Sequence, residues 1–230
     1  MVPEAKSNLE LGSTSEELRS ALIAAAHLLA ASGSMSSTGH LNFSARLNDQ
    51  QVLLTSTGTI DGLTADDIAV LRFDGSVESG RLGKSTREIV GMHMVVYQAR
   101  PDANAVLHTH SPHLVAFALA HRPLPCRYEP LLRHGQSSAV PVVRWAPRGS
   151  EPSVRGIADA LEKNSTTRAV LLANHGVLAF AASPRAAAKL VITMEEAARA
   201  EIQAAALGGA RDLPPGGFKA VRASMERVPT

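Results

Sequence analysis

The chain has 230 residues, of which 45% are hydrophobic and 19% are charged, and its formal net charge is only +2. This composition is typical of a globular protein, and the weak charge argues against binding to nucleic acid or to an anionic membrane. The single cysteine, Cys126, excludes a framework of internal disulfides and suits a reducing compartment. The N-terminus is polar and lacks the apolar core of a signal peptide, so we expect a cytoplasmic protein.

Predicted helices and strands alternate along the chain after a loose leader at residues 1–13. Hydrophobic period and capping residues predict helices at 14–33, 85–100, 111–121, 153–164 and 183–209. Strands are predicted at 51–58, 68–75, 104–110 and 138–145, and one or two more within 168–180. The strand at 138–145 contains Pro141, which favours a sheet edge. Nothing resembling a linker divides these elements, so we expect one α/β domain at 14–209, followed by a loop and tail at 210–230.

Three of the nine histidines lie within six residues, at positions 108, 110 and 113. Side chains two residues apart on a strand share a face, so His108 and His110 could offer two imidazoles to one metal ion. On these two residues alone, ordinary hydrogen-bonded histidines are an equally good interpretation. His175, at a turn after another apolar strand, offers a third ligand, and three imidazoles with an open position are typical of catalytic zinc.

For the other histidines weighed here, the sequence predicts at most packing or support of a metal ligand. His93 lies on a predicted helix face and suits either the core or support of a metal ligand, and His113 is a further candidate for such support. His27, in the first predicted helix, is expected to pack.

An open metal site needs a group that carries protons, and Glu88 is the candidate. The stretch Ser85-Thr86-Arg87-Glu88 also has the S-x-x-E pattern of a capping box, which is the favoured interpretation of these four residues alone. A helix start also binds anions through its backbone N–H groups. The small polar stretches at 55–58 (TSTG) and 41–44 (LNFS) are interpreted as loops that could contribute to the same site.

The order of these motifs, over about residues 15 to 205, resembles that of the class II aldolase/adducin family. The family's Gly-Asn-x-Ser, Thr-Pro-Thr-Gly and Ser-Ser-Glu loops are similar to residues 42–44, 55–58 and 86–88. Its His-x-His motif resembles residues 108–110, within YQARPDANAVLHTHS, and its late histidine before glycine resembles residues 175–176.

The resemblance implies a role for each matching residue. His108, His110 and His175 would hold a divalent metal, usually zinc, with Mn²⁺, Co²⁺ or Mg²⁺ as alternatives. Glu88 would be the acid/base, near the metal and able to ligate it when substrate is absent. The phosphate or carboxylate of a small-molecule substrate would contact the residues Asn42, Thr57, Gly58, Thr86 and Arg87.

The resemblance also implies an α/β/α fold around a mostly antiparallel sheet. It further implies a homotetramer with active sites at subunit interfaces, where Tyr128 is the candidate for the family's catalytic interface tyrosine. No nucleic acid or membrane partner is expected.

The sequence departs from the family pattern on the substrate side. Leu41 replaces the loop glycine before Asn42, with Gly39-His40 lying further back, and Arg87 replaces a serine. The first expectation is retro-aldol cleavage of a phosphorylated ketose or hydroxy-keto compound through a metal-stabilised enediolate. Three alternatives stay open: decarboxylation of a keto-sugar acid or aromatic carboxylate, which Arg87 favours, epimerisation, and a non-catalytic adducin-like binding protein.

Overall fold

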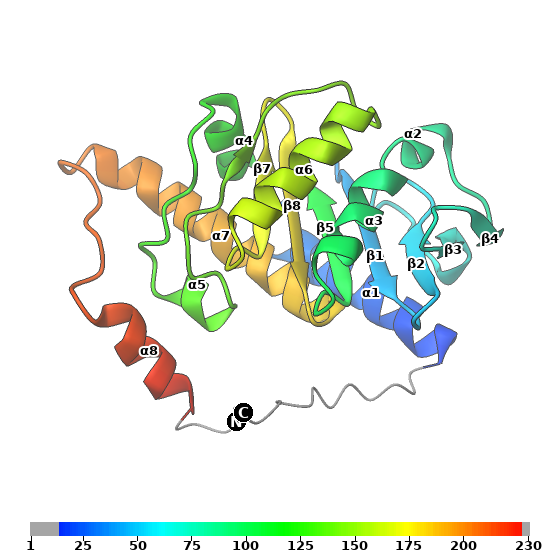
Figure 1. Cartoon of the computed structure of the whole chain (residues 1–230), viewed down its shortest axis with the longest axis horizontal. Helices are drawn as coiled ribbons and strands as arrows, with labels where there is room; N and C mark the ends of the chain where they lie inside the picture. The colour runs from blue at the N-terminus through cyan, green and yellow to red at the C-terminus, as the bar shows by residue number, and fades with distance from the viewer. Residues whose placement is uncertain (1–13, 227–230) are drawn as a thin grey trace.

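A computed structural model describes residues 14–226, in which an eight-stranded sheet lies between two layers of helices (Figure 1). The strands follow one another across the sheet in the order β4 (Val77–Ser79), β3 (Ile68–Arg72), β2 (Gln51–Thr55), β1 (Leu41–Arg46), β5 (Ala105–Thr109), β8 (Gly176–Ala181), β7 (Ala169–Leu172) and β6 (Val142–Val143). Every pairing is antiparallel except that of β6 with β7. The expected α/β/α fold with a mostly antiparallel sheet is confirmed, and β6, directly after Pro141, is an edge strand.

Helices cover both faces of the sheet. One face packs against α1 (Ser15–Ala31), α4 (Pro112–Leu119) and α7 (Pro184–Ala205), and the other against α3 (Val90–Ala99) and α6 (Glu151–Lys163). In Figure 1, α3 and α6 lie in front of the sheet, and α1 and α7 lie behind it. The shorter helices are η1 (Ala65–Asp67), α2 (Lys84–Arg87), α5 (Pro130–Arg133) and α8 (Gly217–Glu226).

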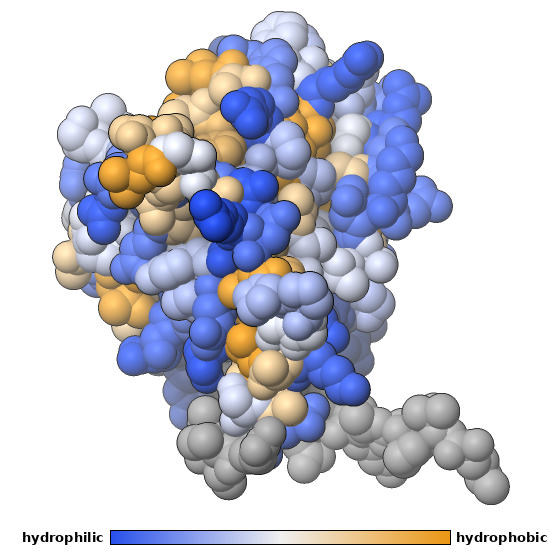
Figure 2. All heavy atoms as spheres, turned by 90° about the vertical axis from the view of Figure 1, so that its left-hand side faces the viewer, coloured by the Kyte–Doolittle hydropathy of each residue, from blue (hydrophilic) through white to orange (hydrophobic). Residues whose placement is uncertain are grey.

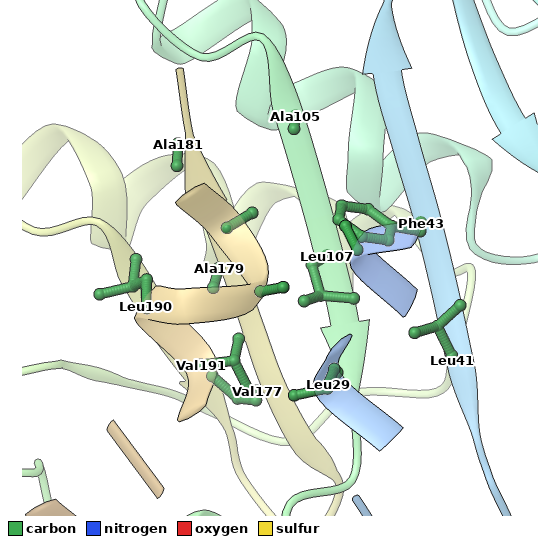
Figure 3. Close-up of a cluster of buried hydrophobic side chains, with 14 of the residues drawn as sticks. Leu29, Leu41, Phe43, Ala105, Leu107, Val177, Ala179, Ala181, Leu190 and Val191 are labelled. Carbon is green, nitrogen blue, oxygen red and sulfur yellow. The ribbon is translucent and has the colours of Figure 1, made fainter. Parts of the chain in front are cut away.

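The alternation of side chains along β5 divides the core into two clusters and places the histidines. Leu107 points to the α1 and α7 side, where it packs with Val177 and Leu29 (Figure 3). Val106 points the other way, into the cluster beneath α3 and α6. His108 and His110 are two and four residues beyond Val106, so they face the α3 and α6 side.

Two helix starts follow the capping signals in the sequence. Thr14 and Glu17 form the reciprocal capping box predicted for α1, with N–H···O distances of 3.2 and 2.7 Å. Ser183 caps α7 by accepting from the Ala186 N–H at 3.2 Å, with Pro184 in the first turn. Such caps satisfy N–H groups that have no partner within the helix.

Three expectations about local structure are wrong. Residues 41–44, expected as a loop, belong to the central strand β1, where polar Asn42 and Ser44 alternate with apolar residues. The helix expected at 85–100 is two helices, broken at Glu88-Ile89, and α2 is capped by Gly83, so Ser85 and Glu88 form no capping box. The expected tail contains the helix α8, which packs near α5. The leader at 1–13 and the last residues, 227–230, lie outside the described part.

Figure 2 views the side of the molecule that carries α8 and the end of α7, where hydrophobic residues form separate groups among hydrophilic ones. Exposed apolar side chains in these elements include Ile202 and Phe218, and Leu207 is exposed two residues after the end of α7. Across residues 14–226, no helix combines the length and the apolar character that crossing a bilayer requires.

Candidate metal centre

His108 is the most deeply buried imidazole of the centre. It lies on β5 and has no exposed surface, and its Nδ1 lies 2.9 Å from the Val177 carbonyl oxygen on β8. Because a carbonyl only accepts, Nδ1 carries the proton and Nε2 keeps its lone pair. This Nε2 is buried and has no hydrogen-bond partner within the described residues. A carbonyl that holds one ring nitrogen and leaves the other free is the usual arrangement behind a metal-binding histidine.

His110 directly follows β5, and its ring lies 5.2 Å from that of His108, at an interplanar angle of 79°. Its Nε2 is also buried without a partner in the part of the chain that the structure describes. The two rings are therefore roughly perpendicular and lie on one face of the sheet, as the His-x-His spacing predicts.

His175 completes the set from the turn between β7 and β8. Its ring lies 4.7 Å from that of His108 and 4.9 Å from that of His110. The preceding Asn174 adopts φ 59°, and its side-chain oxygen accepts from His121 Nε2 at 2.7 Å. The turn is thus tied to the end of α4, and this contact fixes the backbone position of His175. The structure brings together the three histidines that the sequence predicts as ligands.

His40 is a fourth imidazole in the same group, and the sequence did not single it out as a ligand. Its ring stacks on that of His110, with centroids 4.1 Å apart and an interplanar angle of 16°. One ring nitrogen from each of His40, His108 and His110 lies within 4.8 Å of the others. The apolar–polar alternation of β1 was a visible signal for a strand here, but the pairing that sets His40 against His110 joins residues far apart in the sequence.

The four imidazoles are in an environment that keeps them neutral. Burial holds the pKa of His108 well below its usual value, and lowers that of His110 to about 4. Burial also lowers the pKa of His40 and His175. The positive charge of Arg148 contributes to the lowering at His40, His110 and His175. Neutral imidazole is the form that binds a metal, so buried lone pairs without partners fit a divalent ion with nitrogen ligands.

Glu88 is linked to this group through Arg148, which pairs with its carboxylate and whose charge acts on three of the histidines. Arg148 Nε and Nη2 lie 3.0 and 2.9 Å from the same carboxylate oxygen, Oε2, which leaves Oε1 free of this pair. The loop after Arg148 can approach Glu88 this closely because residue 149 is glycine: a Cβ at this position would lie 2.7 Å from the Glu88 carbonyl oxygen. Gly149 also adopts φ 76°, which other residues rarely do. Arg148 was not among the candidates from the sequence, and only the packing of its loop on Glu88 reveals it.

The residues expected at the substrate divide into two groups. Asn42 is buried on β1 opposite His108, and Gly58 lies next to the ring of His40. Thr86 Oγ1 donates to the Ser56 carbonyl at 3.0 Å and so ties α2 to the 55–58 loop.

Three expected site residues point away from the histidines or are exposed in this single chain. Arg87 Nε donates to the Leu82 carbonyl, and its side chain lines a cleft with Phe73 and Met94, away from the histidines. Thr57 is exposed on its loop, where its hydroxyl donates to the Thr59 carbonyl at 3.1 Å. Tyr128, before α5, is 38% exposed.

Three further histidines that the sequence analysis weighed lie outside the centre. His93 is fully buried between α3 and the sheet, where its Nδ1 and the Tyr97 hydroxyl each lie 2.8 Å from Ser44 Oγ, so it belongs to the core. His113 pairs with the buried carboxylate of Glu195 at 2.7 Å rather than with a histidine of the centre. His27, expected to pack, is exposed on α1.

A family model described as Class II Aldolase and Adducin N-terminal domain matches residues 20–202, which is most of the chain. The chain belongs to this family.

Among its relatives in the class II aldolase and adducin family, the L-fuculose phosphate aldolase of Escherichia coli O6:H1 is 34% identical over 139 residues. That match covers 60% of this chain and 61% of the aldolase, less than two thirds of that protein's length. The 3-oxo-tetronate 4-phosphate decarboxylase of Haemophilus influenzae is 32% identical over 168 residues, covering 69% of this chain and 74% of the decarboxylase. A solved L-fuculose 1-phosphate aldolase superposes with a TM-score of 0.80 at 26% identity, over 95% of this chain and all of that one.

Proposed function

We propose that the protein is a divalent-metal-dependent carbon–carbon lyase of the class II aldolase type. Its reaction is the retro-aldol cleavage of a phosphorylated ketose or hydroxy-keto compound. The observation that carries this proposal is the convergence of His108, His110 and His175, with unpartnered Nε2 atoms on His108 and His110. When bound, a divalent ion, zinc by preference of the nitrogen ligands, supplies Lewis-acid stabilisation of the enediolate that cleavage leaves.

Glu88 is the proposed proton carrier. Its carboxylate would remove the proton from the hydroxyl group β to the substrate carbonyl, and that carbon becomes an aldehyde as the carbon–carbon bond breaks. The electron pair of the broken bond stays on the fragment that holds the original carbonyl, and Glu88 returns the proton to that carbon. Arg148 holds Oε2 of Glu88, so we assign the proton transfer to Oε1.

Substrate binding is proposed for the polar residues around the imidazoles. Asn42 and Gly58 adjoin the centre directly, while Thr86 positions the loop that carries Thr57 and Gly58. The positive charge of Arg148 lowers the pKa of His110, whereas Arg87 bonds the Leu82 carbonyl. Arg148 is therefore a stronger candidate than Arg87 to bind an anionic group of the substrate.

Decarboxylation of a keto acid is the second candidate, and Arg148 favours it. A fixed positive charge beside the centre suits a substrate carboxylate, and loss of carbon dioxide leaves the same enolate that cleavage does. The similarity to the Haemophilus influenzae decarboxylase supports this candidate.

The first experiment is the metal content of purified protein, measured by plasma mass spectrometry beside His108→Ala. We expect about one divalent ion per chain, lost in the variant. Turnover is then screened with ketose phosphates against keto acid phosphates. Glu88→Gln should keep the metal and lose about 10²- to 10⁴-fold in turnover. A parent protein that takes up neither zinc nor manganese would instead favour an adducin-like binding protein.

We further propose a homotetramer whose interfaces complete the active site, with Tyr128 as the interface residue. The exposure of Tyr128 and of Trp145, which is 64% exposed, leaves both available to a second subunit. Sedimentation velocity reads the assembly state directly, and a stable monomer at micromolar concentration would contradict this arrangement.

A further inference from the structure

We propose that His40 is a fourth imidazole ligand of the metal centre, in the coordination position that Glu88 would otherwise take. The proposal rests on the function proposed above, in which His108, His110 and His175 hold the ion. It concerns how this particular chain completes the centre.

The backbone of His40 is held in place by its neighbours in the sheet. β1 and β5 pair with Leu41 opposite Thr109, so the same register carried one residue further sets His40 opposite His110. Thr109 Oγ1 donates to the His40 carbonyl at 2.8 Å, and His40 bridges to Thr59 on its other side. Both sides of the backbone are therefore bonded at His40, and its ring lies beside those of His110 and His108.

The ring of His40 has a nitrogen available for a metal. Its Nε2 is buried and lacks a hydrogen-bond partner within residues 14–226, as do the Nε2 atoms of His108 and His110. Burying a polar atom without a partner is unfavourable, and one ion would satisfy all three nitrogens at once. The rings of His40 and His110 are nearly parallel, so in-plane lone pairs cannot yet meet at one ion. Ligation would require the His40 ring to turn about its Cβ–Cγ bond, and within the described residues no hydrogen bond of Nε2 opposes that turn.

Glu88 is engaged elsewhere. Both contacts of its carboxylate with Arg148 are at 3.0 Å or less, and its side chain is 43% exposed. The group of possible metal ligands around His40 consists of His40, His108 and His110 and contains no carboxylate of the described residues, and the ring of His175 lies 4.7 Å from that of His108. An all-imidazole set adds no negative charge, so the full double charge of the ion would act on the anionic oxygens of the substrate. It also leaves Glu88 free to move a proton.

The test measures zinc affinity by competition with a chromophoric chelator, using the full chain and the variants His40→Asn, Glu88→Gln and His108→Ala. We expect His40→Asn to weaken zinc binding at least about tenfold, and Glu88→Gln to leave it within about twofold. Unfolding curves of the metal-free variants establish that each one folds.

A second variant reports on ligation directly. His40→Cys loaded with Co²⁺ should show a thiolate-to-cobalt charge-transfer band that the parent, with Cys126 in place, does not show. Absence of the band, together with parental zinc affinity in His40→Asn, would overturn the role of His40 while the three-histidine centre stands. Weakening by Glu88→Gln equal to that by His40→Asn would also overturn it. Failure of the parent to bind zinc would instead refute the proposed function.

Discussion

The rings of His108 and His110 pack closely against Gly176. A Cβ at this position would lie 2.6 Å from the Thr109 carbonyl oxygen, 2.8 Å from His110 Cδ2 and 3.3 Å from His108 Cε1. The first contact is with backbone, which cannot move without disturbing the pairing of β5 with β8. The glycine after His175 is therefore required by the close approach of β5, and the same close approach brings His175 to the other two rings.

Gly176→Ala should disturb both the fold and the centre. We expect a loss of about 1–3 kcal/mol in the free energy of unfolding and at least about tenfold weaker zinc binding, because the rings must separate. Urea denaturation of the metal-free protein and chelator competition measure the two effects. Gly217→Ala, at the start of α8, is the control, since its nearest contact is the Leu213 side chain at 3.2 Å. Parental zinc affinity in Gly176→Ala would show that the rings do not depend on this space.

At the scale of elements, the helix after the two strand histidines is held by a carboxylate from another helix. Glu195, on α7, accepts from the His113 and Leu114 N–H groups at 2.9 and 3.0 Å, at the start of α4. The N-cap residue Ser111 makes no side-chain capping bond. A buried carboxylate at a helix N-terminus satisfies free N–H groups and complements the helix dipole. This contact therefore fixes the chain just beyond His110.

Glu195→Gln should lower the free energy of unfolding by about 1–3 kcal/mol, because a charged acceptor of two N–H groups is replaced by an amide. Chemical denaturation measures the loss. Glu196→Gln is the matched control, since Glu196 is the next residue on α7 and is exposed. Equal stability of the two variants would mean that the α4 start is satisfied in another way.

At the scale of the whole molecule, the sheet buries neutral histidines on its α3 and α6 side. Burial lowers the pKa of His93 from 6.5 to about 3, and within residues 14–226 the side chain that hydrogen-bonds its ring is that of Ser44. Between those pH values the unfolded chain binds a proton at His93 that the folded chain does not. Acidification through this window therefore favours unfolding.

We expect the free energy of unfolding of the metal-free protein to fall as the pH falls from 6.5 towards 3. His93 contributes up to about 1.4 kcal/mol per pH unit. Urea midpoints at pH 7.5 and 5 measure this slope, which should be smaller in His93→Asn, whose side chain stays neutral. His27→Asn, changed at an exposed position on α1, should keep the parental slope. An unchanged slope in His93→Asn would assign the acid sensitivity to other groups.

The sequence by itself was enough to predict three candidate ligand histidines, two at β5 and its end and one in the turn between β7 and β8. A His-x-His pair on a strand shares a face because of the two-residue period, and a histidine before glycine marks the turn after β7. The helix starts at Thr14 and Ser183 were also predictable. Each of these features depends on residues within a few positions of one another, so local geometry is sufficient.

Only the tertiary structure decided how the rest of the centre is assembled. His40 meets His110 through the register of β1 on β5, Arg148 reaches Glu88 because its loop packs there, and Glu88 lies at the break between α2 and α3. These contacts join segments about 60 to 70 residues apart. Sequence periodicity describes which face a side chain takes, but not which distant strand or loop will lie against that face, because packing of the whole core selects that partner.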